Sequence, residues 1–185
     1  CGWLHILAFP AAAAERPRMT YTLDSSITNS AYSSQISASM AAAVENYNRY
    51  AVFSGPAWGS FPVRAYYNSS VPTAEGSGGG SITFGSQRNT RTAQHELGHV
   101  LGAGQHSQWS VLMVGGVWQG DYAQATLKAL DGRDVQLNGD AIHFWPYGLN
   151  YDSEWNSSSA RKNVLMTAAW RVDLGIGYTW PPVNG

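Results

Sequence analysis

The chain has 185 residues, of which only 12% are charged, with 11 Lys and Arg against 12 Asp and Glu for a formal net charge of -1. The length favours one domain with a real hydrophobic core, and the balanced charge lacks the basic face expected of a nucleic-acid-binding protein. No apolar stretch reaches the roughly 18 residues of a membrane-spanning helix, and the 8 Trp and 10 Tyr offer too much apolar surface for a disordered chain.

Residues 1–16 are expected to be the remnant of a secretory signal peptide or another N-terminal extension. Residues 2–14 pass from an apolar core to small residues suited to cleavage before Glu15. An ordinary N-terminal strand is the alternative, and a mature lipoprotein beginning at Cys1 fits less well because apolar residues follow directly. Cys1 is the single cysteine, so no internal disulfide forms. With the low charge, the pattern predicts a secreted, extracellular protein whose residues 17–185 form one domain.

The first half of the chain is predicted to contain a small sheet and one long helix. Residues 31–51 form this helix, because Ile36, Met40 and Val44 recur at helical spacing and share one face. The glycine-rich residues 76–80 lack the Gly-Lys-Ser/Thr of a phosphate-binding loop, so we interpret them as a flexible loop or bulge. Alternating β-forming residues predict three strands, at residues 19–24, 61–67 and 81–84.

Three shorter helices are predicted in the rest of the chain. The first is capped by Asn89 or Thr90 and ends near Gly102. The last spans residues 160–174 and is terminated by Gly175.

The middle helix spans residues 121–130 and is expected to be capped by its first residue, an aspartate. Tyr122, Ala125 and Leu130 would face inward, and Gly132 would end the helix. A sheet with helices followed by an irregular helical half predicts an α+β domain divided by a cleft.

The strongest chemical signal is the run His95-Glu96-Leu97-Gly98-His99 in the first of these helices. Helical residues four apart lie on the same face, so both imidazoles can hold one Zn²⁺. Glu96 follows the first histidine and can take a proton from a zinc-bound water as general base, because zinc lowers the pKa of that water to about 7. The alternative is a helix with two incidental histidines.

A catalytic zinc needs a third protein ligand and an open position for water. At this point the chain resembles the metzincin zinc endopeptidases, whose extended motif is His-Glu-x-x-His-x-x-Gly-x-x-His, and the match runs through Gly102. The third histidine of that motif would fall at Gln105, one residue before His106. A one-residue bulge would be needed to bring His106 to the metal.

The downstream sequence is similar to the leishmanolysin branch, in which a long insertion separates the helix-ending glycine from the third histidine. The insertion would be residues 103–142, and His143 would be the ligand. His106 is the alternative, and a carboxylate at Asp140 or Glu154 is a further candidate. The resemblance implies a metzincin-like single domain, with a small sheet, long helix and zinc helix before the cleft and an irregular helical part after it. In the downstream sequence the resemblance rests on residues 118–130, 135–137, 143–145 and 172–175.

Metzincins place a methionine turn beneath the zinc, soon after the third histidine. The chain after His143 turns without a methionine, so we expect Leu149 or a neighbour to lie below the site. Met113 and Met166 could also pack there, although both have the ordinary character of core residues.

Two tyrosines and one strand are candidates for substrate contacts. Tyr147 and Tyr151 are close enough in sequence to reach the cleft, where a hydroxyl could stabilise an oxyanion. Half-buried packing is the commoner role of such tyrosines. The strand at residues 81–84 precedes the zinc helix and resembles the metzincin edge strand that pairs with an extended peptide.

The resemblance implies a secreted zinc-dependent endopeptidase that acts on peptide or protein substrates, and we expect a monomer. The displaced third ligand and the missing methionine keep a second hypothesis open, namely a non-catalytic or carbohydrate-directed secreted zinc-binding module. A zinc hydrolase of a non-peptide ester or amide is a third, since a hydroxide nucleophile is not selective for peptides. Sugar stacking would involve tryptophans at positions 58, 109, 118, 145 and 155.

Overall fold

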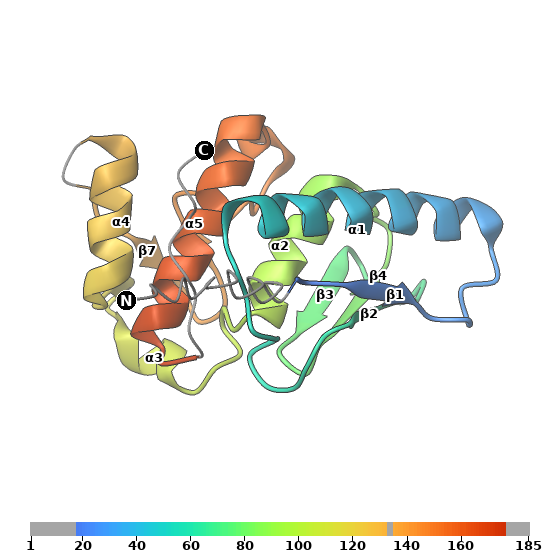
Figure 1. Cartoon of the computed structure of the whole chain (residues 1–185), viewed down its shortest axis with the longest axis horizontal. Coiled ribbons are helices and arrows are strands. Elements are labelled where there is room, and N and C mark those ends of the chain that lie inside the picture. Colours follow the sequence, from blue (N-terminus) through green and yellow to red (C-terminus); the bar gives the residue numbers. More distant parts are fainter. Residues whose placement is uncertain (1–17, 133–134, 177–185) are drawn as a thin grey trace, which may run out of the picture.

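The computed structural model describes residues 18–132 and 135–176, so the prediction for residues 1–16 lies outside the described residues. Within the described ranges the chain is α+β, with five α-helices and two four-stranded sheets (Figure 1). None of the helices in these ranges is long and apolar enough to cross a membrane.

The first sheet is formed by the N-terminal half of the chain. Its order is β1-β2-β4-β3, with β1, β2 and β4 parallel and β3 antiparallel at one edge. The three predicted strands are confirmed, and β3 is a strand that the sequence analysis missed. The strands are β1 Tyr21–Leu23, β2 Val63–Tyr67, β3 Ala74–Ser77 and β4 Ser81–Phe84.

Strand β3 corrects the interpretation of the glycine-rich run. Gly76 and Ser77 pair with Ile82 and Ser81 in an antiparallel hairpin, and only residues 78–80 form the turn. The edge strands of this sheet are therefore β1 and β3, whereas β4 lies between β2 and β3. The expectation that residues 81–84 form the edge was wrong, because the glycines that suggested a loop are accommodated in a strand.

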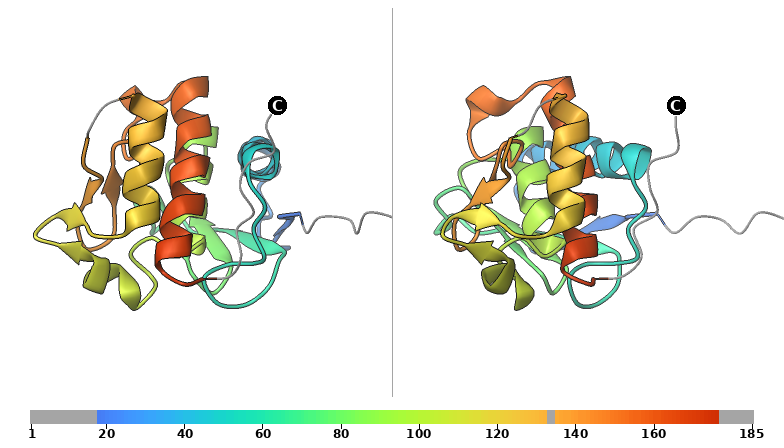
Figure 2. Two further views of the ribbon diagram at one scale, coloured as in Figure 1. Left: turned by 60° about the vertical axis from the view of Figure 1, so that its left-hand side comes forward. Right: turned by 90° about the vertical axis from the view of Figure 1, so that its left-hand side faces the viewer.

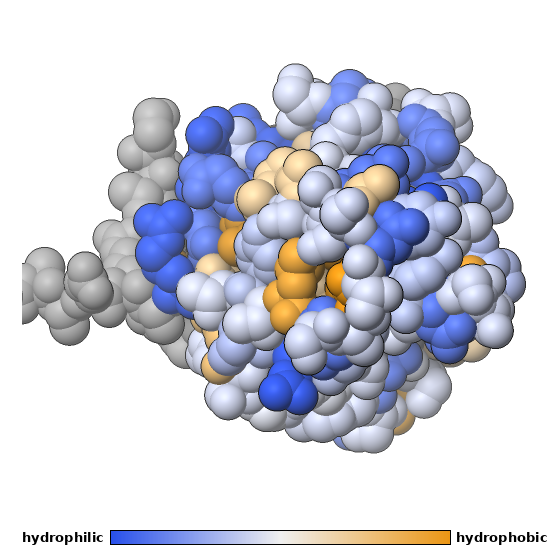
Figure 3. Space-filling model, turned by 90° about the vertical axis from the view of Figure 1, so that its right-hand side faces the viewer, coloured by the Kyte–Doolittle hydropathy of each residue, from blue (hydrophilic) through white to orange (hydrophobic). Residues whose placement is uncertain are grey.

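Helices α1 (Ser30–Tyr50) and α2 (Thr90–Val100) pack against each other and on the first sheet (Figure 1). Helix α1 begins where the Asn29 side chain accepts hydrogen bonds from two backbone N–H groups of the first turn. Its predicted apolar face is buried, including Ile36 and Met40. The molecular face at the N-terminal end of α1 is mostly hydrophilic, with a small group of hydrophobic residues at its centre (Figure 3).

The C-terminal half contains two long helices that lie side by side, α4 (Asp121–Asp131) and α5 (Ser157–Asp173) (Figure 2). A second, antiparallel sheet of two-residue strands has the order β5-β6-β7-β8. The sequence predicts irregular helical structure here, because strands of two residues show no alternating pattern. The remaining elements are α3 Gln108–Leu112, β5 Met113–Val114, β6 Val117–Trp118, β7 Asn138–Gly139, β8 Phe144–Trp145 and a 3-10 helix at Asp152–Glu154.

Helix α4 ends at Gly132 as predicted, but its predicted cap is wrong. Asp121 makes no side-chain capping bond. Instead, the carboxylate of Asp173 at the end of α5 accepts hydrogen bonds from the backbone N–H groups of Tyr122 and Ala123, at 2.9 and 3.0 Å. A side chain distant in sequence thus accepts the hydrogen bonds of backbone N–H groups that have no partner within the first turn of α4.

The predicted inward face of α4 is only partly correct, since of its three residues Leu130 alone packs against the core. Ala123 and Leu127 are buried, whereas Tyr122 is 62% exposed and Ala125 is exposed. Leu130 is half-buried. Apolar residues lie on more than one side of this helix, and packing on α5 selects the face that is buried.

Large aromatic residues form the core of the C-terminal half. The ring of Trp109 lies 4.9 Å from that of Trp118 and 5.5 Å from that of Trp170, measured between centroids. Phe144, the residue after His143, joins this cluster at 6.4 Å from Trp109. Trp109 and Trp118 are thus core residues, and the cluster holds the start of β8 in place. Three of the predicted surface tryptophans are substantially exposed, at positions 58, 145 and 155.

Candidate metal centre

Helix α2 places His95 and His99 on one face, as the sequence predicted. The helix begins after Asn89, whose side chain accepts a hydrogen bond from the backbone N–H of Thr92 at 2.8 Å. The Nε2 atoms of His95 and His99 lie 3.2 Å apart. Two imidazoles bound to one zinc at about 2.0–2.1 Å in a tetrahedral arrangement would have nitrogens about 3.3 Å apart. The pair therefore fits a shared ion.

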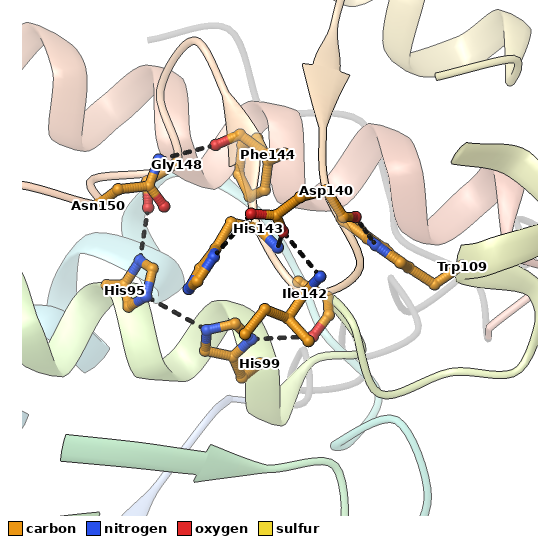
Figure 4. Close-up of polar contacts among 10 residues, drawn as sticks. His95, His99, Trp109, Asp140, Ile142, His143, Phe144, Gly148 and Asn150 are labelled. Atoms are coloured by element: carbon orange, nitrogen blue, oxygen red, sulfur yellow. Dashed lines mark hydrogen bonds and ion pairs between the residues drawn. The ribbon is translucent and has the colours of Figure 1, made fainter. Parts of the chain in front are cut away.

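His143 comes to the same point from the segment just before β8 (Figure 4). Its ring lies 5.5 Å from the ring of His95 and 5.5 Å from the ring of His99, measured between centroids. One ligand atom from each of the three histidines lies within 4.8 Å of the others, close enough to bind a metal ion.

The other candidate ligands are not brought to this point. His106 lies in the turn after α2, where its backbone N–H donates to the Gly102 carbonyl and its Nδ1 accepts from the Gln108 N–H. The Glu154 carboxylate accepts from the backbone N–H of Asn150 at 3.0 Å. Among the described residues, neither His106 nor Glu154 belongs to a group that could share an ion with His95.

Each of the three rings is held at Nδ1 by an oxygen acceptor. His95 Nδ1 lies 2.8 Å from the Gly148 carbonyl, and His99 Nδ1 lies 2.9 Å from the Ala103 carbonyl. His143 Nδ1 lies 3.3 Å from the Asp140 carboxylate. A carbonyl or carboxylate oxygen can only accept, so the proton of each neutral ring is on Nδ1 and the Nε2 lone pair is left for a metal.

Burial keeps the two helical histidines neutral. It lowers the pKa of His95 to about 3, with a further contribution from the neighbouring His99. Burial also lowers the pKa of His99. In neutral rings with the proton on Nδ1, the two Nε2 atoms face each other without a proton between them. This contact between two acceptors is the arrangement that a cation would stabilise.

Asp140 positions His143. Its Oδ1 atom accepts hydrogen bonds from the backbone N–H groups of Ile142 and His143, at 2.9 and 2.6 Å. The indole N–H of Trp109 donates to the Asp140 carbonyl at 3.1 Å (Figure 4). Asp140, considered as a ligand from the sequence, instead holds the ring of the neighbouring histidine. Its spacing of three residues from His143 was a signal that could have suggested this role.

Glu96 lies between the two helical histidines and is 5% exposed. Burial raises the pKa of its carboxyl to about 7, opposed by hydrogen bonding from the Gly76 backbone and by the charge of Arg91. Strand β3 lies very close to this part of α2, since a Cβ added at Gly76 would be 2.3 Å from the Glu96 carbonyl oxygen. A carboxyl of this pKa can both accept and donate a proton near neutral pH.

A pocket of about 390 Å³ opens at this centre, and His95, Glu96 and His143 line it. Tyr151 also lines this pocket and is 71% exposed. Tyr147 does not, because it borders a different cavity and its hydroxyl donates to Asp131 at 2.6 Å and lies 2.9 Å from Lys162 Nζ. Of the two predicted tyrosines, Tyr151 is therefore the one that lines the pocket at the metal centre.

The turn after His143 contains two residues with positive φ, Tyr147 at 70° and Leu149 at 58°. Leu149 is fully buried, and its carbonyl lies 3.3 Å from Nη1 of Arg91 in α2. This bond and the Gly148 carbonyl tie the turn to the helix that carries the histidines. Met166 is fully buried in α5, as expected of a core residue.

No protein-family model matches the chain, and no curated protein or solved structure matches it either.

Proposed function

We propose that the chain is a secreted, zinc-dependent endopeptidase of the metzincin type, in which His95, His99 and His143 hold the zinc and Glu96 is the general base. The observation that carries this proposal is the convergence of three imidazoles, each with Nδ1 tied to an oxygen acceptor. Such partners orient the ligands of metal sites and make them more basic.

Three neutral imidazole ligands suit zinc and leave a coordination position open, as catalytic rather than structural zinc sites do. When bound there, zinc would supply Lewis acidity, which polarises the scissile carbonyl and makes water more acidic. His95 and His143 line the open pocket, so the ligand-binding side of the centre is accessible to a substrate.

Glu96 is placed to move protons in the reaction. It lines the pocket beside His95, and helix α2 holds it against β3. Glu96 takes a proton from the attacking water and delivers it to the nitrogen of the leaving amine, so that the carboxylate is restored after each cleavage.

Strand β3 favours a peptide among the classes of substrate. It is the antiparallel edge of the first sheet, and it contacts α2 at Glu96 through Gly76. An extended peptide that adds to this edge would pass the Glu96 side chain, with main-chain hydrogen bonds that depend little on sequence. The metzincin resemblance implies that an edge strand pairs with the peptide substrate. In this chain the edge strand beside α2 is formed by residues 74–77 instead of residues 81–84. Secretion is proposed from the sequence alone, that is, from its low charge and from the signal-peptide-like pattern of residues 1–16.

The test is cleavage of casein and of a quenched fluorescent peptide by zinc-loaded protein. We expect activity that a chelator removes and zinc restores, and a loss of about 10²- to 10⁴-fold in Glu96→Gln. Glu45→Gln is the control, because Glu45 is an exposed residue of α1 whose ion pairs lie at the surface. Wild-type protein that binds zinc but cleaves no peptide would refute the peptidase proposal. Hydrolysis of an ester, or binding of a polysaccharide without hydrolysis, would then identify one of the two alternatives.

A further inference from the structure

The pocket beside the metal centre is lined by residues of polar or charged types. Every residue that lines it among those described carries a hydrogen-bonding or charged side chain, and none is aliphatic. A pocket that receives an aliphatic side chain would be lined mainly by apolar groups. Besides the metal-centre residues, the lining residues are Thr73, Gln87, Arg91, Thr92 and the segment 150–152.

Arg91 supplies a buried cation to this pocket. It lies one helical turn before His95 and is 7% exposed. Its Nε donates to Asp152 at 2.8 Å, Nη2 donates to Gln87 at 2.6 Å and Nη1 lies 3.3 Å from the Leu149 carbonyl. A guanidinium carries five N–H donors, so two of them make no hydrogen bond within the described part of the chain.

Gln87 adds further unused donors. Its Oε1 accepts from Arg91 Nη2 at 2.6 Å and from the Thr92 hydroxyl at 3.3 Å. Because Oε1 already accepts these two hydrogen bonds, the NH₂ group of the Gln87 amide is the part of the side chain that remains to donate. The hydroxyl of the exposed Tyr151 is a further donor at the pocket wall. Asp152, the carboxylate opposite, already pairs with Arg91. The unpaired donors of Arg91, Gln87 and Tyr151 therefore lie in the same pocket as the carboxyl groups of Glu96 and Asp152, which can accept.

We infer that this pocket binds the side chain of a substrate residue next to the scissile bond and selects a group that both accepts and donates hydrogen bonds, namely the carboxamide of Asn or Gln. The inference rests on the proposed peptidase function. An aliphatic side chain of the same size would cover the donors of Arg91 and Gln87 without pairing them. Sites with hydrogen-bonding groups discriminate strongly against ligands that lack the matching group.

Matched peptides test this selection. Quenched peptides that differ only in the residue on either side of the cleaved bond would carry Gln, Glu, Asn, Met or Leu there. We expect kcat/KM to be at least about tenfold higher for Gln than for Met, which has a similar length, at one of the two positions. Equal rates, or a preference for Met and Leu at both positions, would overturn the inference.

Substitutions in the pocket test whether its hydrogen-bond donors cause the preference for Gln over Met. Gln87→Met removes the amide, and Tyr151→Phe removes an exposed hydroxyl without changing the ring, so each should reduce the ratio of Gln to Met rates. Gln108→Met is the control for Gln87→Met, because Gln108 is an exposed residue of α3 outside the pocket. A ratio that stays at the wild-type value in both pocket variants would refute the assignment.

A binding measurement separates this inference from the proposed activity. Fluorescence polarisation would report binding of the same peptides to zinc-loaded Glu96→Gln, in which turnover is not required. Tighter binding of the Gln peptide than of the Met peptide supports the pocket even if the wild-type protein cleaves neither. Equal binding of the two peptides refutes the pocket even if the wild-type protein cleaves both.

Discussion

Gly104 lies directly against Ile142, so closely that a Cβ added at Gly104 would be 2.4 Å from the Ile142 Cα. This contact joins the turn that follows α2 to the residue before His143. The φ of Gly104 is +65°, in the left-handed region that favours glycine. The absence of a side chain at this position thus allows the third histidine to approach the two on the helix.

Gly104→Ala should weaken zinc binding by about 10- to 100-fold, because the new methyl group displaces the segment that carries His143. Zinc affinity would be measured by competition with a chromogenic chelator, with circular dichroism to confirm folding. Gly115→Ala is the control, since Gly115 has a similar φ of +58° and no atom within 4 Å of an added Cβ. Both variants carry backbone strain of about 1–2 kcal/mol, so equal zinc affinities would contradict the positional role of Gly104.

Asp140→Ala should also lower the affinity for zinc by about 10- to 100-fold, because His143 loses the acceptor that orients its ring. Titration with zinc by isothermal calorimetry would measure the change. Asp24→Ala is the matched control, since Asp24 makes the same kind of bond to a backbone N–H two residues ahead, that of Ser26, and lies far along the chain. Unchanged affinity in Asp140→Ala would show that the ring is oriented without the carboxylate.

The third ligand is identified by comparing His143→Ala with His106→Ala. We expect zinc content close to one ion per chain in wild type and in His106→Ala, and a large loss in His143→Ala, because His143 alone of the two lies beside His95 and His99. Metal analysis after dialysis against buffer with trace zinc gives the answer. Loss of zinc in His106→Ala with retention in His143→Ala would reverse the assignment.

Gly76→Ala should impair both catalysis and metal binding, because the added methyl group would press on Glu96 and would lie 2.9 Å from the Cβ of the zinc ligand His99. The added methyl group would lie 2.3 Å from the Glu96 carbonyl oxygen, so β3 and α2 must separate, which costs about 1–3 kcal/mol of stability as an overpacked contact. Denaturant unfolding measures the loss of stability, kcat/KM on the quenched peptide measures catalysis, and competition with a chromogenic chelator measures zinc affinity. Gly79→Ala, in the turn of the same hairpin, is the control because its nearest contact would be an ordinary 3.5 Å. Equal stability of the two variants would disprove the close approach.

Several parts of this molecule could be predicted because they depend on neighbours in sequence. The Asn89 cap, the helical spacing of His95 and His99 and the terminating Gly132 all follow from local backbone geometry. The cap of α4 could not be predicted from the sequence, because Asp173 belongs to another helix and lies 50 residues along the chain from Ala123. Strand β3 was missed because its glycine is required by a close contact with α2 rather than by a turn.

By itself, the sequence determined the pair of helical histidines and the acid between them, since one turn of helix is enough to define their spacing. Only the tertiary structure decided between His143 and His106 and found the Gly148 carbonyl that holds His95, 53 residues away. A backbone carbonyl has no signature in the sequence, and its partner is set by how the turn after β8 packs on α2. The residues that orient a metal ligand thus become visible only when distant segments are brought together.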